Sequence, residues 1–417
     1  MRVGRTTTTY RTAEQEARHQ KCVQTILYVL AAIFMIAVPI GLYEVEHVKK
    51  AASEAFYEIE PQVVPGATNE KSLASFAGHV VHVTGTPNPA ELCDNDFGVC
   101  SNTFLRVQRN VEYCQWTEHY TEHKDRDNEG NTVTTRQYYY TLGWHGSPVS
   151  SLFFNQPFAH NNPQRNPFPS AGAVAASATV GPYTVPSTIL ARIDADRLLE
   201  PSRDQLRDFR ESPAARDFQY IGRGYFYSPY QASTMSKIAQ FAGRALEGSL
   251  DIQLGDFLKS CEAGDIRVHF KVADPEYVTV VAQQQSGNGM LNDAIASNGY
   301  HVGLIRSGLM SPSALFHFEV ARLGWRVVAL RCVAVAWGLV SLLVLRSVFP
   351  GLTTLHWAHY ILGSLLMGSA LSALGYILVW GATSWSALFI CLGCLAALPT
   401  WAFTSGAMAA VPKVAAM

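Results

Sequence analysis

Residues 347–412 read SVFPGLTTLHWAHYILGSLLMGSALSALGYILVWGATSWSALFICLGCLAALPTWAFTSGAMAAVP, between Arg346 and Lys413. This stretch contains no Asp, Glu, Lys or Arg, whereas a soluble domain needs charged side chains on its outward face. A helix needs roughly 20 apolar residues to cross a bilayer core. The stretch therefore predicts two membrane-spanning helices, at residues 355–380 and 384–411, and an integral membrane protein.

Two further segments of the chain are candidates for membrane spans. Residues 22–43 (CVQTILYVLAAIFMIAVPIGLY) carry no charge, and the run is too long for a signal-peptide core. Residues 327–349 form the fourth candidate, although they contain Arg331 and Arg346. Both arginines lie near an end of the segment, from which long cationic side chains can reach the headgroups. The sequence thus predicts four membrane-spanning helices.

Basic residues near the first span predict the orientation of the chain. Residues 1–21 carry Arg2, Arg5, Arg11, Arg18 and Lys21, and the positive-inside rule places such a basic tail in the cytosol. Four crossings return the tail at residues 412–417 to the cytosol. The domain at residues 44–325 is then lumenal. The net charge is −1 and the chain has no basic block, so the sequence gives no indication of a nucleic-acid partner.

The lumenal domain has the alternation of apolar and polar residues that is typical of β-strands. The apolar residues of 266–272 recur with period two, and the β-branched run at 277–283 follows, which predicts a hairpin. Strands are also expected at residues 105–116 and 138–144, joined by a charged reverse turn at 124–131. The fold class expected is a four-span membrane α-helical protein with a mainly β, α+β lumenal domain between spans 1 and 2.

Helices are expected to be fewer in this domain. Residues 187–209 are charged and contain leucines, with Pro201 interrupting the pattern. Ser311 followed by Pro312 is a good helix start that leads towards the second span. Residues 163–186 are rich in Pro, Ala and Ser, and we expect them to be irregular.

Four of the eight cysteines lie in the lumenal domain: Cys93, Cys100, Cys114 and Cys261. An even number suits disulfide bonds in an oxidising compartment. Three pairings are possible, of which Cys93–Cys100 is the local candidate. The alternative is four ordinary buried thiols.

The sequence presents no constellation that indicates catalysis, a metal or a cofactor. His119 and His123 have the i, i+4 spacing of metal ligands on a helix, but they follow a strand and enter a charged turn, where that spacing has no such meaning. No nucleotide-binding glycine loop, nucleophile elbow or zinc-protease motif is present. We therefore expect a scaffold or adaptor rather than an enzyme.

The third span carries a stripe of small residues that predicts helix packing. Ser364, Gly368 and Ser372 recur every four residues, and such stripes let helices approach closely in lipid. The partner would be the fourth span or another copy of the protein.

Several short segments, read in order, resemble the transmembrane protein 43 family. The segment 111–118 (VEYCQWTE) is similar to that family's V-E-x-x-Q-W-x-E stretch, and residues 160–163 (HNNP) and 264–268 (GDIRV) follow in the same order. The residues that carry the resemblance are Val111, Glu112, Gln115, Trp116, Glu118, His160, Asn162 and Pro163. The resemblance covers nearly the whole chain from the first span to the fourth.

This resemblance implies a four-span protein of the endoplasmic reticulum and inner nuclear membrane, with a lumenal central domain. It also implies self-association and links to other nuclear-envelope membrane proteins, and it implies no catalysis and no cofactor. The hypothesis is a multipass, non-catalytic scaffold that contacts membrane lipids and organises membrane protein complexes and the nuclear envelope. A lipid-binding or lipid-modifying enzyme with an aromatic pocket is the alternative, and a channel subunit is a third possibility.

Overall fold

The computed structural model describes residues 2–163, 167–230, 261–285 and 287–345, and the single residues 377 and 379. The chain divides into two compact units, and each is built from segments that are far apart in the sequence. Unit 1 comprises residues 1–11, 63–294 and 303–310. Unit 2 comprises residues 12–62, 295–302 and 311–417.

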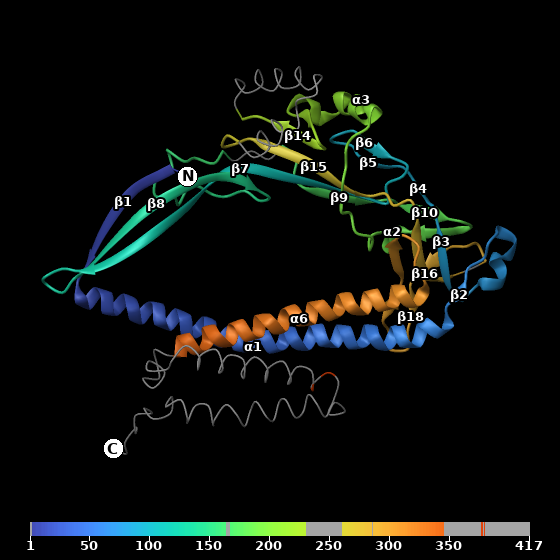
Figure 1. The fold of residues 1–417 in the computed structure, drawn as a ribbon, viewed down its shortest axis with the longest axis horizontal. Helices are drawn as coiled ribbons and strands as arrows, with labels where there is room; N and C mark the ends of the chain where they lie inside the picture. The colour runs from blue at the N-terminus through green and yellow to red at the C-terminus, as the bar shows by residue number, and fades with distance from the viewer. Residues whose placement is uncertain are drawn as a thin grey trace, which may run out of the picture. The chain divides into compact units, whose positions relative to one another are not determined.

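Unit 1 is formed mainly by β-sheets, of which the largest has eight strands (Figure 1). Its strands lie in the order β1 (Arg2–Arg11), β8 (Thr132–His145), β7 (Arg106–Arg126), β15 (Ile266–Ala273), β14 (Tyr225–Ser228) and β13 (Gln219–Gly222). In addition, β12 (Arg197–Leu198) pairs with β15, and β9 (Ala171–Val174) pairs with β7.

Two smaller sheets and one short hairpin complete the strands of unit 1. One sheet has the order β17 (Leu291–Asn292), β16 (Val278–Gln284), β3 (Val80–Gly85) and β2 (Val64–Pro65), with β20 (Leu304–Ser307) also paired to β16. The other has the order β11 (Tyr183–Pro186), β10 (Ser177–Val180) and β4 (Pro87–Pro89), while β5 (Leu92–Asp94) and β6 (Val99–Ser101) pair with each other. The helices of this unit are short: α2 (Ser187–Leu190), α3 (Arg203–Glu211) and the 3-10 helices η2 (Glu70–Phe76) and η3 (Pro213–Arg216).

Two hydrophobic cores hold unit 1 together. The first lies where β3 and β16 meet β10 and β11, and its centre includes Val81, Val280 and Tyr183, all fully buried. The second lies beneath β7 and β15 and includes Phe97 and Phe270. The inward side chains of β7 and β15 alternate with polar ones, as the sequence pattern predicts for a half-buried sheet.

Beyond Tyr113, β7 and β8 continue as a long antiparallel ribbon with β1 along the outer edge of β8 (Figure 1). Residues 1–21 are expected from the sequence to form a tail apart from the domain, but in the structure Arg2–Arg11 form a strand of the domain's own sheet. Four consecutive threonines, residues 6–9, account for this, because β-branched side chains favour the extended backbone.

Unit 2 is formed by two long helices that lie side by side, α1 (Ala13–Ile59) and α6 (Pro312–Leu345) (Figure 1). Thr12 and Gln15 form a capping box at the start of α1, and the Ser311 hydroxyl accepts from the Ala314 N–H at the start of α6, where a helix start is expected. The 3-10 helix η1 (Glu60–Gln62) follows α1 directly, and the short strands β18 (Ala294–Ile295) and β19 (His301–Val302) pair with each other.

Arg331 does not occupy the position expected from the sequence. Instead of extending towards lipid headgroups, its guanidinium donates to the Glu46 carboxylate, and the Glu46 side chain is 1 % exposed. A carboxylate that is buried in this way needs a partner of opposite charge, and α6 supplies that partner to α1 through Arg331.

The expected four-span helical fold class is wrong for the part of the chain that the structure describes. No helix in those residues is both long enough and apolar enough to cross a membrane, and the described fold is mainly β-sheet. Residues 22–43 and most of 327–349 lie within the longer helices α1 and α6. Apart from residues 377 and 379, the segments 355–380 and 384–411 lie outside the described residues, as does the stripe Ser364, Gly368 and Ser372.

Two expectations about strands are also wrong. β15 and β16 follow each other but do not form a hairpin, because β15 pairs with β7 and β14 whereas β16 pairs with β3 and β20. Each strand already has a partner on both edges, β7 and β14 for β15 and β3 and β20 for β16, so neither has an edge left for a hairpin between them. Residues 163–186 are not irregular throughout, since β9, β10 and β11 lie within them.

Candidate interaction site

The segment between β8 and β9 begins as a loop, residues 146–163, that folds back against β7. Asn162 holds this loop through three hydrogen bonds. Its Oδ1 accepts from the Trp116 N–H at 2.7 Å, and its Nδ2 donates to the Trp116 carbonyl at 2.9 Å and to the Val149 carbonyl at 3.1 Å. The first two bonds satisfy both backbone groups of Trp116 on the edge of β7, as a neighbouring strand would. Gln115 adds a fourth bond, since its Oε1 accepts from the Val149 N–H at 2.6 Å.

A second group of contacts surrounds Tyr140 on β8. Its hydroxyl donates to Glu118 Oε2 at 2.6 Å and accepts from the Gln156 N–H at 3.1 Å. The His160 ring stacks on Tyr140 with 3.6 Å between ring centroids, and the edge of His160 meets Trp116 at 4.9 Å. Burial and the neighbouring Glu118 carboxylate raise the pKa of Tyr140 to about 12, so the phenol stays a hydrogen-bond donor at neutral pH.

These contacts fix the base of the loop, and its tip presents apolar side chains. Leu152, Phe153 and Phe158 are 80 %, 91 % and 99 % exposed. Residues 146–163 include no Asp, Glu, Lys or Arg. Large apolar side chains that are exposed on a loop with a buried, hydrogen-bonded base form a candidate interaction surface. We call Leu152, Phe153 and Phe158 the apolar tip.

The structure brings together most of the residues that carry the family resemblance. Gln115, Trp116, Glu118, His160 and Asn162 all contact one another or the same loop. Their shared position shows that these residues of the pattern VEYCQWTE…HNNP hold the loop 146–163 against β7 and β8.

The remaining residues of that pattern have other roles in unit 1. Val111 is part of the core beneath β7. Glu112 lies on the other face of the sheet, where Arg267 Nε donates to its Oε2 at 2.7 Å. Pro163 packs beside Gly264, whose φ of +97° and closeness to Tyr230 leave no room for a side chain.

The disulfide Cys114–Cys261 lies next to this loop and to a buried carboxylate. Asp265 is completely buried, and it accepts from the Glu262 N–H at 2.8 Å, the Tyr230 N–H at 2.9 Å and the Tyr227 hydroxyl. Burial and the Asp265 charge raise the pKa of Tyr227. The cluster is satisfied internally, which is the arrangement of a structural group.

The second disulfide, Cys93–Cys100, closes a loop on the far side of the core beneath β7. Phe97 at the centre of this loop is fully buried and contacts Phe209, Phe218, Phe226 and Phe270.

Arg109 fixes the same loop from β7. Its Nη1 lies 2.8 Å from Asp94 Oδ1 and 2.9 Å from Asp96 Oδ2, and its side chain is almost fully buried. Burial raises the pKa of Asp94, and the Arg109 charge acts in the opposite direction.

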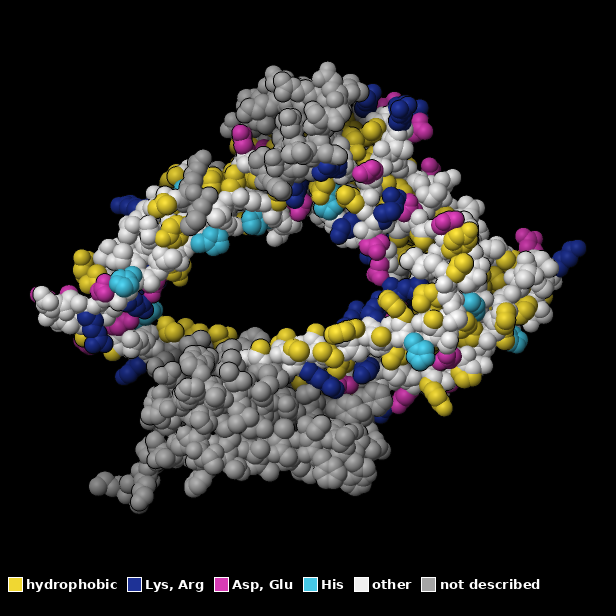
Figure 2. Space-filling view, viewed as in Figure 1, with side chains coloured by type: hydrophobic (Ala, Val, Ile, Leu, Met, Phe, Trp, Pro, Cys, Tyr) yellow, Lys and Arg dark blue, Asp and Glu magenta, His cyan; other side chains and the backbone are white. Residues whose placement is uncertain are grey.

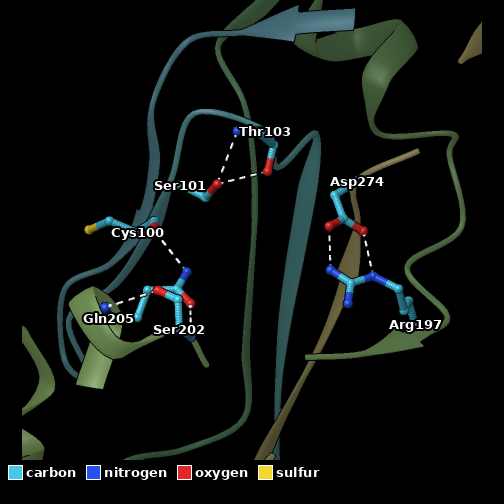
Figure 3. A network of polar contacts seen from close by, with 7 residues as sticks. All are labelled: Cys100, Ser101, Thr103, Arg197, Ser202, Gln205 and Asp274. Atoms are coloured by element: carbon cyan, nitrogen blue, oxygen red, sulfur yellow. Dashed lines mark hydrogen bonds and ion pairs between the residues drawn. The ribbon is translucent and has the colours of Figure 1, made fainter. Parts of the chain in front are cut away.

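Two open, polar pockets lie on either side of the Cys93–Cys100 loop. One, of about 280 Å³, is lined by Cys93, Asp94, Asp96 and Arg109. The other, of about 470 Å³, is lined by acidic and hydroxyl residues beside the start of α3. Figure 3 shows that its polar groups are engaged with one another: Gln205 Nε2 donates to the Cys100 carbonyl at 2.9 Å, and Arg197 forms a two-bond pair with Asp274. Neither pocket is an apolar cavity of the kind that holds a lipid chain.

The aromatic side chains that an alternative lipid pocket would use are engaged elsewhere. Trp116 and Tyr140 contact His160, Tyr138 contacts Tyr120, and Trp144 lies against Arg267 at 4.4 Å. His119 and His123 lie on β7, and no group of three metal-binding side chains occurs in the described residues.

Sequence reasoning missed the apolar tip and the role of Arg109. A signal for the tip was present, because residues 146–163 contain no Asp, Glu, Lys or Arg and include the large apolar residues Leu152, Phe153 and Phe158. Nothing local in the sequence indicates that Arg109 is buried, since it occupies an inward position of a strand that is otherwise apolar on that face.

Comparison with known proteins points to the same family. The family described as Transmembrane protein 43 matches residues 113–398, which is more than half of the chain and includes the anchored loop. The chain belongs to the transmembrane protein 43 family. It is a membrane protein of that family.

Several animal members of the transmembrane protein 43 family are 24–25 % identical to this chain over the aligned residues. Transmembrane protein 43 from Pongo abelii is 24 % identical over 355 residues, which cover 81 % of this chain and 76 % of that protein. Transmembrane protein 43 from Mus musculus has the same identity and coverage. The Transmembrane protein 43 homolog from Drosophila melanogaster is 25 % identical over 255 residues, and the match spans 60 % of this chain and 58 % of the fly protein. No solved structure matches the chain.

Proposed function

We propose that this protein is a non-catalytic organiser of membrane protein complexes in the endoplasmic reticulum and at the inner nuclear membrane, and that it thereby shapes the nuclear envelope. The observation that carries the proposal is the apolar tip on its anchored loop. The loop residues that resemble the family pattern are used to hold this surface in place. An organiser needs such a preformed surface, because a rigid loop loses little conformational entropy when a partner binds.

The two disulfides support the compartment in this proposal. Cys93–Cys100 and Cys114–Cys261 both lie in unit 1, and disulfides persist in the lumen of the endoplasmic reticulum, which is continuous with the space between the two nuclear membranes. The proposed partners are other membrane proteins of the nuclear envelope, bound through the apolar tip.

The test is the size of the native complex and the location of the full-length protein in cells. A Phe153→Ser/Phe158→Ser variant removes the two most exposed aromatic side chains of the tip. Leu309→Ser is the matched control, because Leu309 is 66 % exposed but lies outside residues 146–163. We expect the amount of protein in the high-mass fraction in mild detergent to be about tenfold lower for the double variant than for the wild type, because aromatic anchors dominate the binding energy of such contacts.

Three results would contradict the proposal. They are an unchanged complex in the double variant, an equal loss in Leu309→Ser, and residence of the wild-type protein chiefly at the cell surface or in mitochondria. Transfer of a lipid chain by the purified wild-type protein would favour the lipid-modifying alternative.

A further inference from the structure

The ribbon of β7, β8 and β1 has an edge that no described strand covers. The turn between β7 and β8 is closed by a hydrogen bond from the Asp127 N–H to the Asn131 carbonyl. In the register that follows from this turn, backbone hydrogen bonds to β8 are exchanged by the odd-numbered residues of β7 from 117 to 125, whose partners are 141 to 133. In an antiparallel pair the alternate residues point their N–H and C=O groups the opposite way. The even residues of β7 therefore present theirs at the outer edge.

This outer edge is covered in its first part and uncovered in its last part. At Cys114 the edge is paired with residues 264 and 265, and at Trp116 with the Asn162 side chain. Tyr120, Glu122, Lys124 and Arg126 follow, and all are exposed. β8 lies on their other side, and none of the described strands pairs with them at the outer edge. We call these four residues the β7 edge.

The order of the charges along the β7 edge decides what can pair with it. Charged side chains on an edge strand usually prevent pairing between molecules. Here, however, the acidic residue Glu122 precedes the basic residues Lys124 and Arg126. An antiparallel second copy reverses this order, so that unlike groups come opposite each other. Figure 2 shows basic, acidic and histidine side chains together at the turn end of the ribbon.

We propose that the β7 edge pairs with the β7 edge of a second copy of this chain, antiparallel and with the two-fold axis at His123. In this register Glu122 of one copy lies opposite Lys124 of the other, and Tyr120 lies opposite Arg126. Each of these two pairs occurs twice, and all four are pairs of residues that exchange backbone hydrogen bonds. Opposite charges and an Arg beside an aromatic ring both stabilise such cross-strand pairs.

Contacts of Arg136 within each copy already hold the Glu122 and Tyr120 side chains that this pairing uses. Arg136 Nε donates to Glu122 Oε2 at 2.7 Å and lies over the Tyr120 ring at 4.9 Å. This hydrogen bond lowers the pKa of Glu122, so the carboxylate is charged when the second copy's Lys124 approaches. The two ribbons then form one continuous antiparallel sheet in the order β1-β8-β7 and β7-β8-β1.

The proposed register specifies which residues face each other across the two-fold axis. The two His123 residues would be directly opposite in a pair without backbone hydrogen bonds, where the Cα atoms lie about 4.5 Å apart. That separation is within the range of a disulfide bond. The two Thr121 residues would lie on the same face of the sheet but roughly 14 Å apart along the strands, which no disulfide can span.

The experiment compares His123→Cys with Thr121→Cys in the full-length protein in its native membrane, after mild oxidation. Both positions are exposed, so neither substitution disturbs a core. We expect His123→Cys to give a covalent dimer in about tenfold greater yield than Thr121→Cys or the wild type, whose Cys22 and Cys332 are unbonded and set the background. Equal yields from the two variants, or no dimer from His123→Cys, would overturn the proposal.

A charge exchange tests the same register without new cysteines. Lys124→Glu places two carboxylates opposite each other at both charged pairs of the dimer, and Glu122→Lys places two ammonium groups opposite each other there. After purification away from partner proteins, each variant alone should therefore run as a monomer. A mixture of the two variants restores unlike charges at both pairs and should run as a dimer, so a mixture that stays monomeric would contradict the register. This inference is independent of the apolar tip, because Phe153→Ser/Phe158→Ser should leave the His123→Cys cross-link unchanged.

Discussion

At the scale of single residues, Asn162 has the largest effect that the structure assigns to one side chain of the loop. Asn162→Ala removes the partner of both backbone groups of Trp116 and of the Val149 carbonyl, and the site is nearly inaccessible to water. A buried polar group that loses its partner costs about 1–3 kcal/mol. We expect the thermal unfolding midpoint to fall and the Trp116 amide to exchange its hydrogen much faster than in the wild type.

Asn161→Ala is the matched control for this prediction, since Asn161 is exposed. Among the described residues its one hydrogen bond is long, with Oδ1 accepting from the Ser151 hydroxyl at 3.4 Å. It should leave both measurements within error of the wild type. If Asn161→Ala has the larger effect of the two, the assignment of the anchor to Asn162 is wrong.

His269 makes the stability of unit 1 depend on pH. Burial lowers the pKa of His269, and the Arg267 and Lys271 charges act in the same direction while Glu112 opposes them. As the pH falls through the ordinary value of about 6.5, the unfolded chain binds a proton that the folded chain does not. We therefore expect stability to decrease on acidification, starting near that value and ending at the lower pKa of the folded state.

The measurement is the unfolding midpoint of the wild type, His269→Gln and His79→Gln between about pH 7.5 and about pH 5. His269→Gln should flatten the pH dependence, because it removes the titrating group. His79 lies in the same unit and is exposed, so His79→Gln should keep the wild-type slope. A wild-type slope in His269→Gln would show that another group causes the acid sensitivity.

At the scale of elements, sequence reasoning located strands well and paired them badly. The alternation in residues 266–272 and the charged turn near residue 128 correctly indicate β15 and the β7–β8 hairpin. The turn is local, so its residues determine the pairing of the two strands it joins. The pairing of β15 with β7 joins residues more than 150 positions apart, and no local pattern in either strand specifies it.

The anchored loop shows the same limit in another form. Segments 111–118 and 160–163 could be recognised by resemblance, but only the fold shows that Asn162 completes the edge of β7 at Trp116. Buried Arg109 could not be found at all from sequence, because its partners Asp94 and Asp96 come from a loop closed by a disulfide. The sequence indicates which residue types are present, and long-range contacts decide which of them meet.

At the scale of the whole molecule, both units are assembled from segments that are far apart in the sequence. In unit 2 an ion pair joins the two long helices. Arg331 on α6 donates to Glu46 on α1, across 285 positions of sequence. The burial of the two partners is unequal: the Glu46 side chain is 1 % exposed and that of Arg331 is 37 % exposed. The cost of removing one partner therefore depends on which charge is left behind.

Arg331→Met leaves a buried carboxylate without this cation, and loss of one member of a buried pair costs about 3–5 kcal/mol. Glu46→Gln leaves a cation that can reach water, so it should cost clearly less. The double variant Glu46→Leu/Arg331→Met removes both charges and should recover most of the loss, because apolar packing can replace a buried ion pair. Thermal unfolding of the four proteins, followed by helical circular dichroism, measures these differences. Two results would show that the ion pair does not couple α1 to α6. One is an equal loss of stability in the two single variants, and the other is a loss in the double variant as large as the sum of the two single losses.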